Sequence, residues 1–255
     1  MTSQLTNMAV LPDGAAQITW SVELQAQGLR TAVDVVSGDV ATALEAHTRV
    51  EALLPVDDED GQRIATWSGL RREGVRRDVT GDCVVYARLV TDPPVSDPEG
   101  FRSMLNSFLP RKRAIGQMLV RDRANRVLMC QLTYKRDWDL PGGVVEVNES
   151  PRLATTRELE EELGVTFPAG DLVLTDWLPP WSGWDDAVTL VFDGGVHDSA
   201  VTDSMVLEER EIRSATFCTI DEVRDRATDF TARRVEAALA RLGGTGAPYT
   251  ESGRP

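Results

Sequence analysis

The stretch that most constrains this chain runs from Trp138 to Val165, just past the middle of its 255 residues. Within it, the segment from Arg152 to Leu163 contains no Gly or Pro, which favours an α-helix. Ser150 can cap the start of that helix and Pro151 suits its first turn. Gly164 is a fitting C-terminal stop. We therefore predict one well-bounded helix in this stretch.

The predicted helix carries three carboxylates on one face, because Glu158, Glu161 and Glu162 fall at i, i+3 and i+4. Leu153, Leu159 and Leu163 are expected to point the opposite way, towards a core. Clustered carboxylates repel one another unless a cation lies between them, and hard oxygen ligands suit Mg²⁺ or Mn²⁺. Such a metal polarises a phosphoryl group and generates hydroxide from bound water. A solvated acidic helix face is the alternative.

The spacing of the surrounding residues is more specific than three acidic side chains. Gly143 is followed after five residues by Glu149, and then after seven by the run that begins at Arg157 and ends at Val165. This pattern resembles the Nudix box, and the resemblance covers about Lys112 to Leu242. It implies an α/β/α sandwich around a mixed sheet and Mg²⁺-dependent hydrolysis of a nucleoside diphosphate linked to another moiety, X. In the family, the residues at Arg157 and Glu149 hold the loop against the helix.

The resemblance also implies roles for other residues. The water would be activated by Glu161 or by a carboxylate outside the box, for which Glu211 and Glu209 are candidates. Gly142 and Gly143 would let backbone groups approach the ligand closely. The competing function is a nucleotide sensor that keeps the box but turns over little. Retention of all three helix carboxylates favours the enzyme.

Basic and aromatic residues near the box are candidates for substrate binding. Lys135 and Arg136 could contact phosphate, although plain surface charge is equally consistent with them. Trp181 and Trp184 lie among turn residues, so one of them could stack a base, or both could pack two domains together. Pro179–Pro180 lies where a proline in this family favours ADP-ribose-type substrates.

Composition limits the partners. A net charge of −14 disfavours binding to nucleic acid or to an anionic membrane surface, and leaves a small nucleotide as the expected partner. The three cysteines are far apart, which fits a reducing cytoplasm. No N-terminal signal pattern or membrane-spanning apolar run is evident. A homodimer is possible, as in other Nudix proteins.

The N-terminal part alternates predicted strands with predicted helices, so the whole chain is expected to be α/β (α+β). Its order resembles the second half of a GNAT acetyltransferase, on the segments Gln25–Leu29, Arg49–Ala52 and Gly69–Val75. Arg30 departs from the family's small residue, and the helix before Gly69 has no Tyr. We therefore predict a degenerate, non-acetylating module rather than an active acetyltransferase.

The expected boundaries follow from composition. Residues 1–90 form the GNAT-like partial domain, with a frayed start over residues 1–15. Residues 91–111, rich in proline, form a linker. Residues 112–244 form the Nudix domain, and residues 245–255 a disordered tail.

Overall fold

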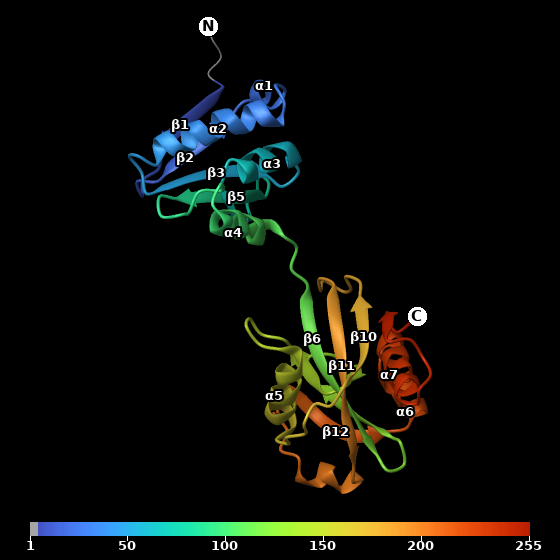
Figure 1. The fold of residues 1–255 in the computed structure, drawn as a ribbon. Helices are drawn as coiled ribbons and strands as arrows, with labels where there is room; N and C mark the ends of the chain where they lie inside the picture. The colour runs from blue at the N-terminus through green and yellow to red at the C-terminus, as the bar shows by residue number, and fades with distance from the viewer. Residues whose placement is uncertain (1–4) are drawn as a thin grey trace. The chain divides into compact units, whose positions relative to one another are not determined.

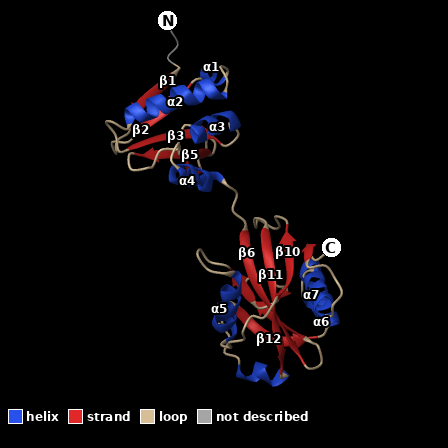
Figure 2. Cartoon of the chain, in the orientation of Figure 1, coloured by secondary structure: helices blue, strands red, loops and turns tan. Residues whose placement is uncertain are grey.

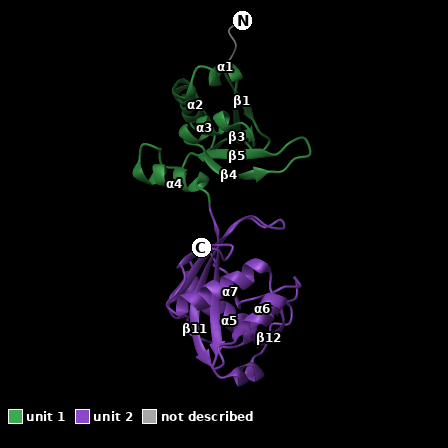
Figure 3. Cartoon of the chain, turned by 90° about the vertical axis from the view of Figure 1, so that its right-hand side faces the viewer, with its two compact units in different colours: residues 1–110 green, residues 111–255 purple. Residues whose placement is uncertain are grey.

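A computed structural model describes residues 5–255, which divide into two compact units, residues 1–110 and 111–255 (Figure 3). Each unit has its own sheet (Figure 2) and its own hydrophobic core. No helix among the described residues combines the length and the apolar character needed to cross a bilayer.

The first unit is a five-stranded sheet with helices. Its elements are β1 (Thr6–Val10), β2 (Ala16–Trp20), α1 (Val22–Gln25), α2 (Leu29–Ala43), β3 (Arg49–Pro55), α3 (Glu59–Trp67), β4 (Arg71–Arg76), β5 (Cys83–Leu89) and α4 (Pro98–Phe108). The strand order is β1-β2-β3-β5-β4, in which only β2 and β3 pair in parallel.

Helices α2 and α3 supply one side of the core of this unit. Val36 and Val40 of α2 lie one helical turn apart and are fully buried, as Ile64 of α3 is. They pack against the inward-facing residues of the sheet, such as Val50 and Ala52 of β3. These two strand residues alternate with half-buried neighbours, the pattern of a sheet with one more deeply covered face.

The second unit is an α/β/α sandwich around a mixed sheet (Figure 1). Its elements are β6 (Arg113–Asp122), β7 (Val127–Leu132), β8 (Trp138–Asp139), β9 (Gly142–Val144), α5 (Pro151–Leu163), β10 (Leu172–Leu178), β11 (Ala187–His197), the 3₁₀ helix η1 (Ser199–Ser204), β12 (Ile212–Cys218), α6 (Ile220–Arg226), α7 (Asp229–Leu242) and β13 (Tyr249–Glu251). The main strand order is β12-β7-β6-β11-β10-β13, with β8 beside β7 and β9 beside β6.

The central strand β6 separates two apolar layers. Met118 packs on the α5 side with Leu159 and Leu163, whereas Leu119 packs on the opposite side with Val235 of α7. Successive residues of a strand point to opposite faces, so this one strand supports both helices. Figure 1 shows α5 on one face of the sheet and α6 and α7 on the other. The sandwich and mixed sheet expected from the resemblance are confirmed.

Two expectations about chain ends are wrong. Residues 6–10 of the supposed frayed start form β1, which pairs with β2 from Thr6↔Trp20 to Val10↔Ala16; residues 1–4 lie outside the described part. The supposed disordered tail contains β13, which pairs in parallel with β10. Both are short edge strands: β1 forms a hairpin with the next strand, β2, whereas the partner of β13 lies far back in the sequence, so local composition gives little sign of β13.

Candidate active site

Helix α5 begins and ends as its sequence predicts. The Ser150 hydroxyl accepts a hydrogen bond from the Leu153 backbone N–H at 3.3 Å, and Gly164 adopts a left-handed φ of 65°. Leu159 and Leu163 are fully buried, but Leu153 is 64% exposed, contrary to the prediction. Leu153 precedes Leu159 by six positions, about 240° around the helix, so it does not share the face that Leu159 and Leu163 bury.

Arg157 joins the helix to the loop before it, as expected. Its Nε and Nη2 donate to the two carboxylate oxygens of Glu149 at 2.9 and 3.0 Å, and Nη2 also donates to the Val144 carbonyl at 3.3 Å. This two-point contact with a planar guanidinium fixes both orientation and distance. The pairing lowers the pKa of Glu149, chiefly through the hydrogen bonds from Arg157.

The same guanidinium also pairs with two of the helix carboxylates. Nη1 of Arg157 donates to Glu161 Oε2 at 2.8 Å and lies 3.0 Å from Glu158 Oε1. The Glu161 side chain is 60% exposed, whereas that of Glu158 is 15% exposed. The carboxylates that sequence spacing made equivalent therefore occupy different environments.

Glu162 lies deepest of the three, with 6% of its surface exposed. Its Oε2 accepts a hydrogen bond from the Gly142 backbone N–H at 3.0 Å. Burial, together with the nearby carboxylates of Glu158, Glu211 and Asp139, raises the pKa of Glu162 to about 8. Burial is also the main cause that raises the pKa of Glu158. Two carboxylates that are costly to ionise thus lie side by side.

The two glycines of the box make room for this arrangement. A Cβ on Gly143 would lie 2.4–2.6 Å from the carboxylate atoms of Glu158. Gly142 has a φ of 134°, and a Cβ there would lie 2.1 Å from the carbonyl oxygen of Gly116, on the paired strand β6. Because these two glycines have no side chain, a carboxylate and a neighbouring strand can pack directly against their backbone. Their predicted approach to a ligand stays a prediction.

The structure does not bring Glu158, Glu161 and Glu162 together as one metal-binding group. Among residues 5–255, no group of three or more His, Cys, Asp or Glu side chains is arranged to hold a metal ion. The contact of Glu161 with Arg157 accounts for this, because it turns one of the three carboxylates towards a cation already present. Glu158 and Glu162 remain, with the exposed Glu211 near enough to raise the pKa of both.

The tryptophan loop is a tight turn between β10 and β11. Trp181 and Trp184 exchange backbone hydrogen bonds of 3.0 and 2.9 Å, and both residues between them have positive φ. The Trp181 ring lies edge-on to Phe230, and the Arg113 guanidinium lies 4.8 Å from the Trp184 ring. Both rings are about half exposed, at 51% and 57%. They are available to a ligand, and their predicted role in stacking remains a prediction.

The two basic residues before the box differ in environment. Lys135 Nζ donates to Asp139 Oδ2 at 2.8 Å, so Lys135 is an internal partner of a carboxylate. Arg136 is exposed and forms no ion pair among residues 5–255. Of the two, Arg136 keeps its charge free for a phosphate.

A buried polar network on the α7 side of the sheet was not predicted. Arg234, 2% exposed, donates from Nε to Asp176 at 2.8 Å and from Nη1 to Gln117 at 3.1 Å. Gln117 donates in turn to Asp139 at 2.9 Å, and Asp176 accepts from Thr250 near the C-terminus. The network therefore links α7 and the C-terminal segment to the strand that precedes the box.

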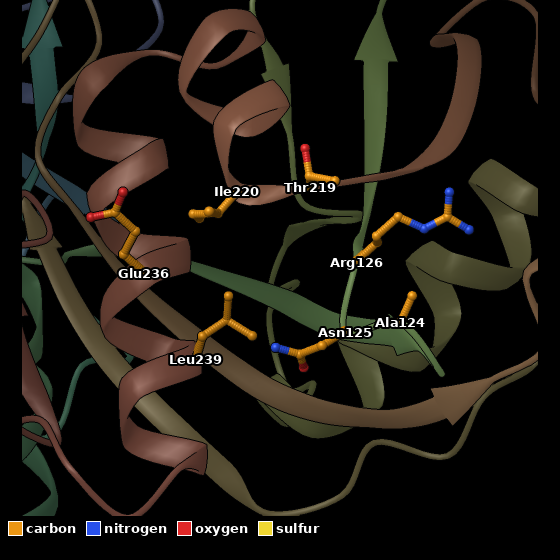
Figure 4. Close-up of a pocket in the computed structure, with 7 residues that line it drawn as sticks. All are labelled: Ala124, Asn125, Arg126, Thr219, Ile220, Glu236 and Leu239. Atoms are coloured by element: carbon orange, nitrogen blue, oxygen red, sulfur yellow. The ribbon is translucent and has the colours of Figure 1, made fainter.

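One further cavity lies apart from these carboxylates. It has a volume of about 410 Å³ and lies between the β6–β7 turn at Asn125, the start of α6 at Ile220, and Leu239 of α7 (Figure 4). None of the residues predicted for catalysis, substrate or metal lines it. We therefore place the candidate active site at the carboxylates of α5.

Comparison with known proteins identifies the family of the second unit. The NUDIX domain family model matches residues 110–239. An RNA pyrophosphohydrolase from Rhodospirillum rubrum is 30% identical over 77 residues, which are 30% of this chain and 44% of that protein. An 8-oxo-dGTP diphosphatase from Proteus vulgaris is 37% identical over 59 residues, which are 22% of this chain and 53% of that protein. The chain thus spans about half the length of these curated relatives.

A crystal structure of a UDP-X diphosphatase aligns with 89% of this chain and 98% of its own, at 16% identity and a TM-score of 0.48. The GNAT resemblance of the N-terminal part finds no counterpart in the family match, which begins at residue 110. The family model covers half of the chain and the whole of the helix that bears the carboxylates. This chain belongs to the NUDIX domain family.

Proposed function

We propose that the protein is a Nudix pyrophosphohydrolase that cleaves the pyrophosphate bond of a nucleoside diphosphate linked to another moiety, X. The observation that carries this proposal is the pairing of Glu158 and Glu162 beside Gly142 and Gly143. Placing two carboxylates in a low-exposure site costs free energy, and a divalent cation between them would remove that cost.

The donor chemistry of these residues fits Mg²⁺ or Mn²⁺. Both are oxygen donors, and the pKa of each is raised in the metal-free protein, so each gains a counter-charge when a cation binds. Glu158 and Glu162 would hold the ion, with Glu161 completing the set if it is released from Arg157. The bound cation would polarise the phosphoryl group and lower the pKa of a water ligand.

The chain's own residues then have separate tasks. Arg157 and Glu149 keep the loop of the box against α5. Glu161 or Glu211 would accept the proton of the attacking water, since both are exposed carboxylates near Glu158 and Glu162. Arg136 would hold a phosphate oxygen, and Trp181 or Trp184 the base.

We expect X to be a sugar, as in ADP-ribose or a nucleotide sugar, with a nucleoside triphosphate as the next choice. The prolines at 179–180 support the former. The relatives named as acting on RNA and on 8-oxo-dGTP support a nucleotide but do not agree on its kind. The net charge of −14 weighs against a long RNA.

The test is a hydrolysis screen with Mg²⁺ against EDTA, over ADP-ribose, nucleotide sugars, dinucleoside polyphosphates and damaged nucleoside triphosphates. Turnover that requires Mg²⁺ and is lost in Glu162→Gln supports the enzyme, with Glu160→Gln as the matched control. Binding of a nucleotide without turnover would support a sensor instead. The contact between Glu161 and Arg157 favours that alternative, because it withholds one carboxylate from the metal.

For the N-terminal part, we propose a GNAT-like module that does not acetylate. Helix α2 begins after Gly28, which has a φ of 95° and gives no side-chain cap, so its first backbone N–H groups are open. The purified protein should transfer no acetyl group from acetyl-CoA to amines. Residues 111–255 alone should keep hydrolase activity, whereas insolubility of this fragment would show that the two units depend on each other.

A further inference from the structure

The C-terminal segment that contains β13 is bonded to one buried carboxylate, Asp176. The Thr250 hydroxyl and the Gly253 backbone N–H both donate to Asp176 Oδ1, at 2.7 and 2.8 Å, and Asp176 is fully buried. Gly253 has a φ of 74°, and a Cβ there would lie 2.6 Å from the backbone nitrogen of Arg234. The segment therefore packs directly against α7, at the residue that pairs with Asp176.

Arg234 connects Asp176 to strand β6. Its Nε donates to Asp176 Oδ2 at 2.8 Å, and its Nη1 donates to the side-chain oxygen of Gln117 at 3.1 Å. All three residues are at most 4% exposed. A buried ion pair adds little stability over apolar side chains of the same volume, so core stability alone does not account for these residues. Their fixed geometry points to a role in positioning.

Gln117 holds the segment that precedes Gly142. Its Nε2 donates to Asp139 Oδ1 at 2.9 Å and to the Leu140 carbonyl at 3.4 Å. The next residue is Pro141, whose ring locks its φ. Few backbone torsions therefore remain free between the carbonyl that Gln117 holds and the N–H of Gly142.

The peptide unit between Pro141 and Gly142 is held on both sides. Its carbonyl oxygen accepts from the Met118 backbone N–H at 3.0 Å, and its N–H donates to Glu162 Oε2 at 3.0 Å. Because a peptide unit is planar, the bond to its carbonyl limits the direction in which its N–H points. Glu162 is thus oriented by a backbone group whose own position depends on β6.

We infer that the C-terminal segment, through Asp176, Arg234 and Gln117, positions Glu162 for the cation by holding the Gly142 N–H in place. This inference rests on the proposed function, because it requires Glu162 to bind a metal ion. Groups that hydrogen-bond a metal ligand orient it, and their loss commonly lowers metal affinity by about 10- to 100-fold. The C-terminal segment therefore contributes to cation affinity without supplying a ligand.

The experiment measures the binding of Mn²⁺ to the full chain without nucleotide, from the electron paramagnetic resonance signal of the free ion. Gln117→Met keeps the length of the side chain and removes both of its hydrogen-bonding groups, and should weaken Mn²⁺ binding about tenfold. Thr250→Val removes only the hydroxyl at the far end of the network and should weaken binding in the same direction by less. Thr250→Ser keeps that hydroxyl and should bind Mn²⁺ as the wild type does.

Val235→Ala is the matched control for a purely structural effect. Val235 is the neighbour of Arg234 on α7 and is fully buried, so its truncation should lower the melting temperature and leave Mn²⁺ affinity unchanged. All affinities are compared at a temperature at which every variant is folded. If Gln117→Met does not fold, the comparison of Thr250→Val with Thr250→Ser decides.

Wild-type Mn²⁺ affinity in folded Gln117→Met and Thr250→Val would overturn the inference, because the network would then support only the fold. The proposed function would stand in that case, since the wild-type protein would still bind the ion. A wild-type protein that binds no Mn²⁺ would refute the proposed metal site and this inference together.

Discussion

Replacing Glu162 by Gln should make the metal-free protein more stable while abolishing turnover. Glu162 is almost fully buried, and its pKa is raised from 4.5 to about 8. Between these values the folded state holds a proton that the unfolded state has released, so the free energy of unfolding falls as pH rises. Gln is nearly isosteric, and its carbonyl oxygen can still accept from Gly142, but it never ionises.

The size of the effect follows from about 1.4 kcal/mol for each pH unit between the two pKa values. Relative to the wild type, Glu162→Gln should gain about 1 kcal/mol at pH 5, about 3 kcal/mol at pH 7 and about 5 kcal/mol at pH 9. Below pH 4.5 the difference should vanish, because Glu162 is then protonated in both states.

The assay is urea unfolding in EDTA at these three pH values. Glu160→Gln is the control, since Glu160 is exposed on the same helix and its replacement should leave the pH dependence unchanged. Mg²⁺ should then raise the stability of the wild type more than that of Glu162→Gln, because only a ligand that binds the folded state stabilises it. A difference between the two proteins that is constant from pH 5 to pH 9 would refute the assigned burial of an ionisable Glu162.

Three other substitutions test the site and its support. Gly143→Ala places a Cβ against the flexible end of Glu158, so hydrolysis should fall by about 10²-fold with little change in melting temperature. Trp184→Ala should weaken substrate binding by roughly 1–3 kcal/mol if the ring stacks a base; an unchanged KM would exclude that role. Arg234→Met leaves Asp176 buried without its cation and should destabilise the protein by about 3–5 kcal/mol in urea unfolding, whereas a loss below 1 kcal/mol would contradict the buried pairing.

Local signals predicted the elements around the box well. The caps at Ser150 and Gly164 define α5, because each acts through backbone groups within one turn. The pairing of Arg157 with Glu149 was also predicted, from the resemblance. By contrast, β13 and the Arg234 network depend on partners far apart in the chain. Thr250 and Asp176, for example, are 74 positions apart, and neither carries a local signal for the other.

The three helix carboxylates differ in burial and in partners, and their spacing in the sequence could not predict this difference. Helical geometry places Glu158, Glu161 and Glu162 on one face, but it does not say what covers that face. In the folded chain β9 lies against one part of it, and its Gly142 N–H binds Glu162.

On the other side of this face, Arg157 pairs with Glu149 and Glu161. Its single positive charge is therefore shared among several carboxylates. The deficit of positive charge is therefore greatest at Glu162, which forms no ion pair among residues 5–255, and smaller at Glu158, which shares the charge of Arg157. A divalent cation would bind where this deficit lies. Substitutions that remove the deficit should stabilise the fold and weaken metal binding by the same physical cause.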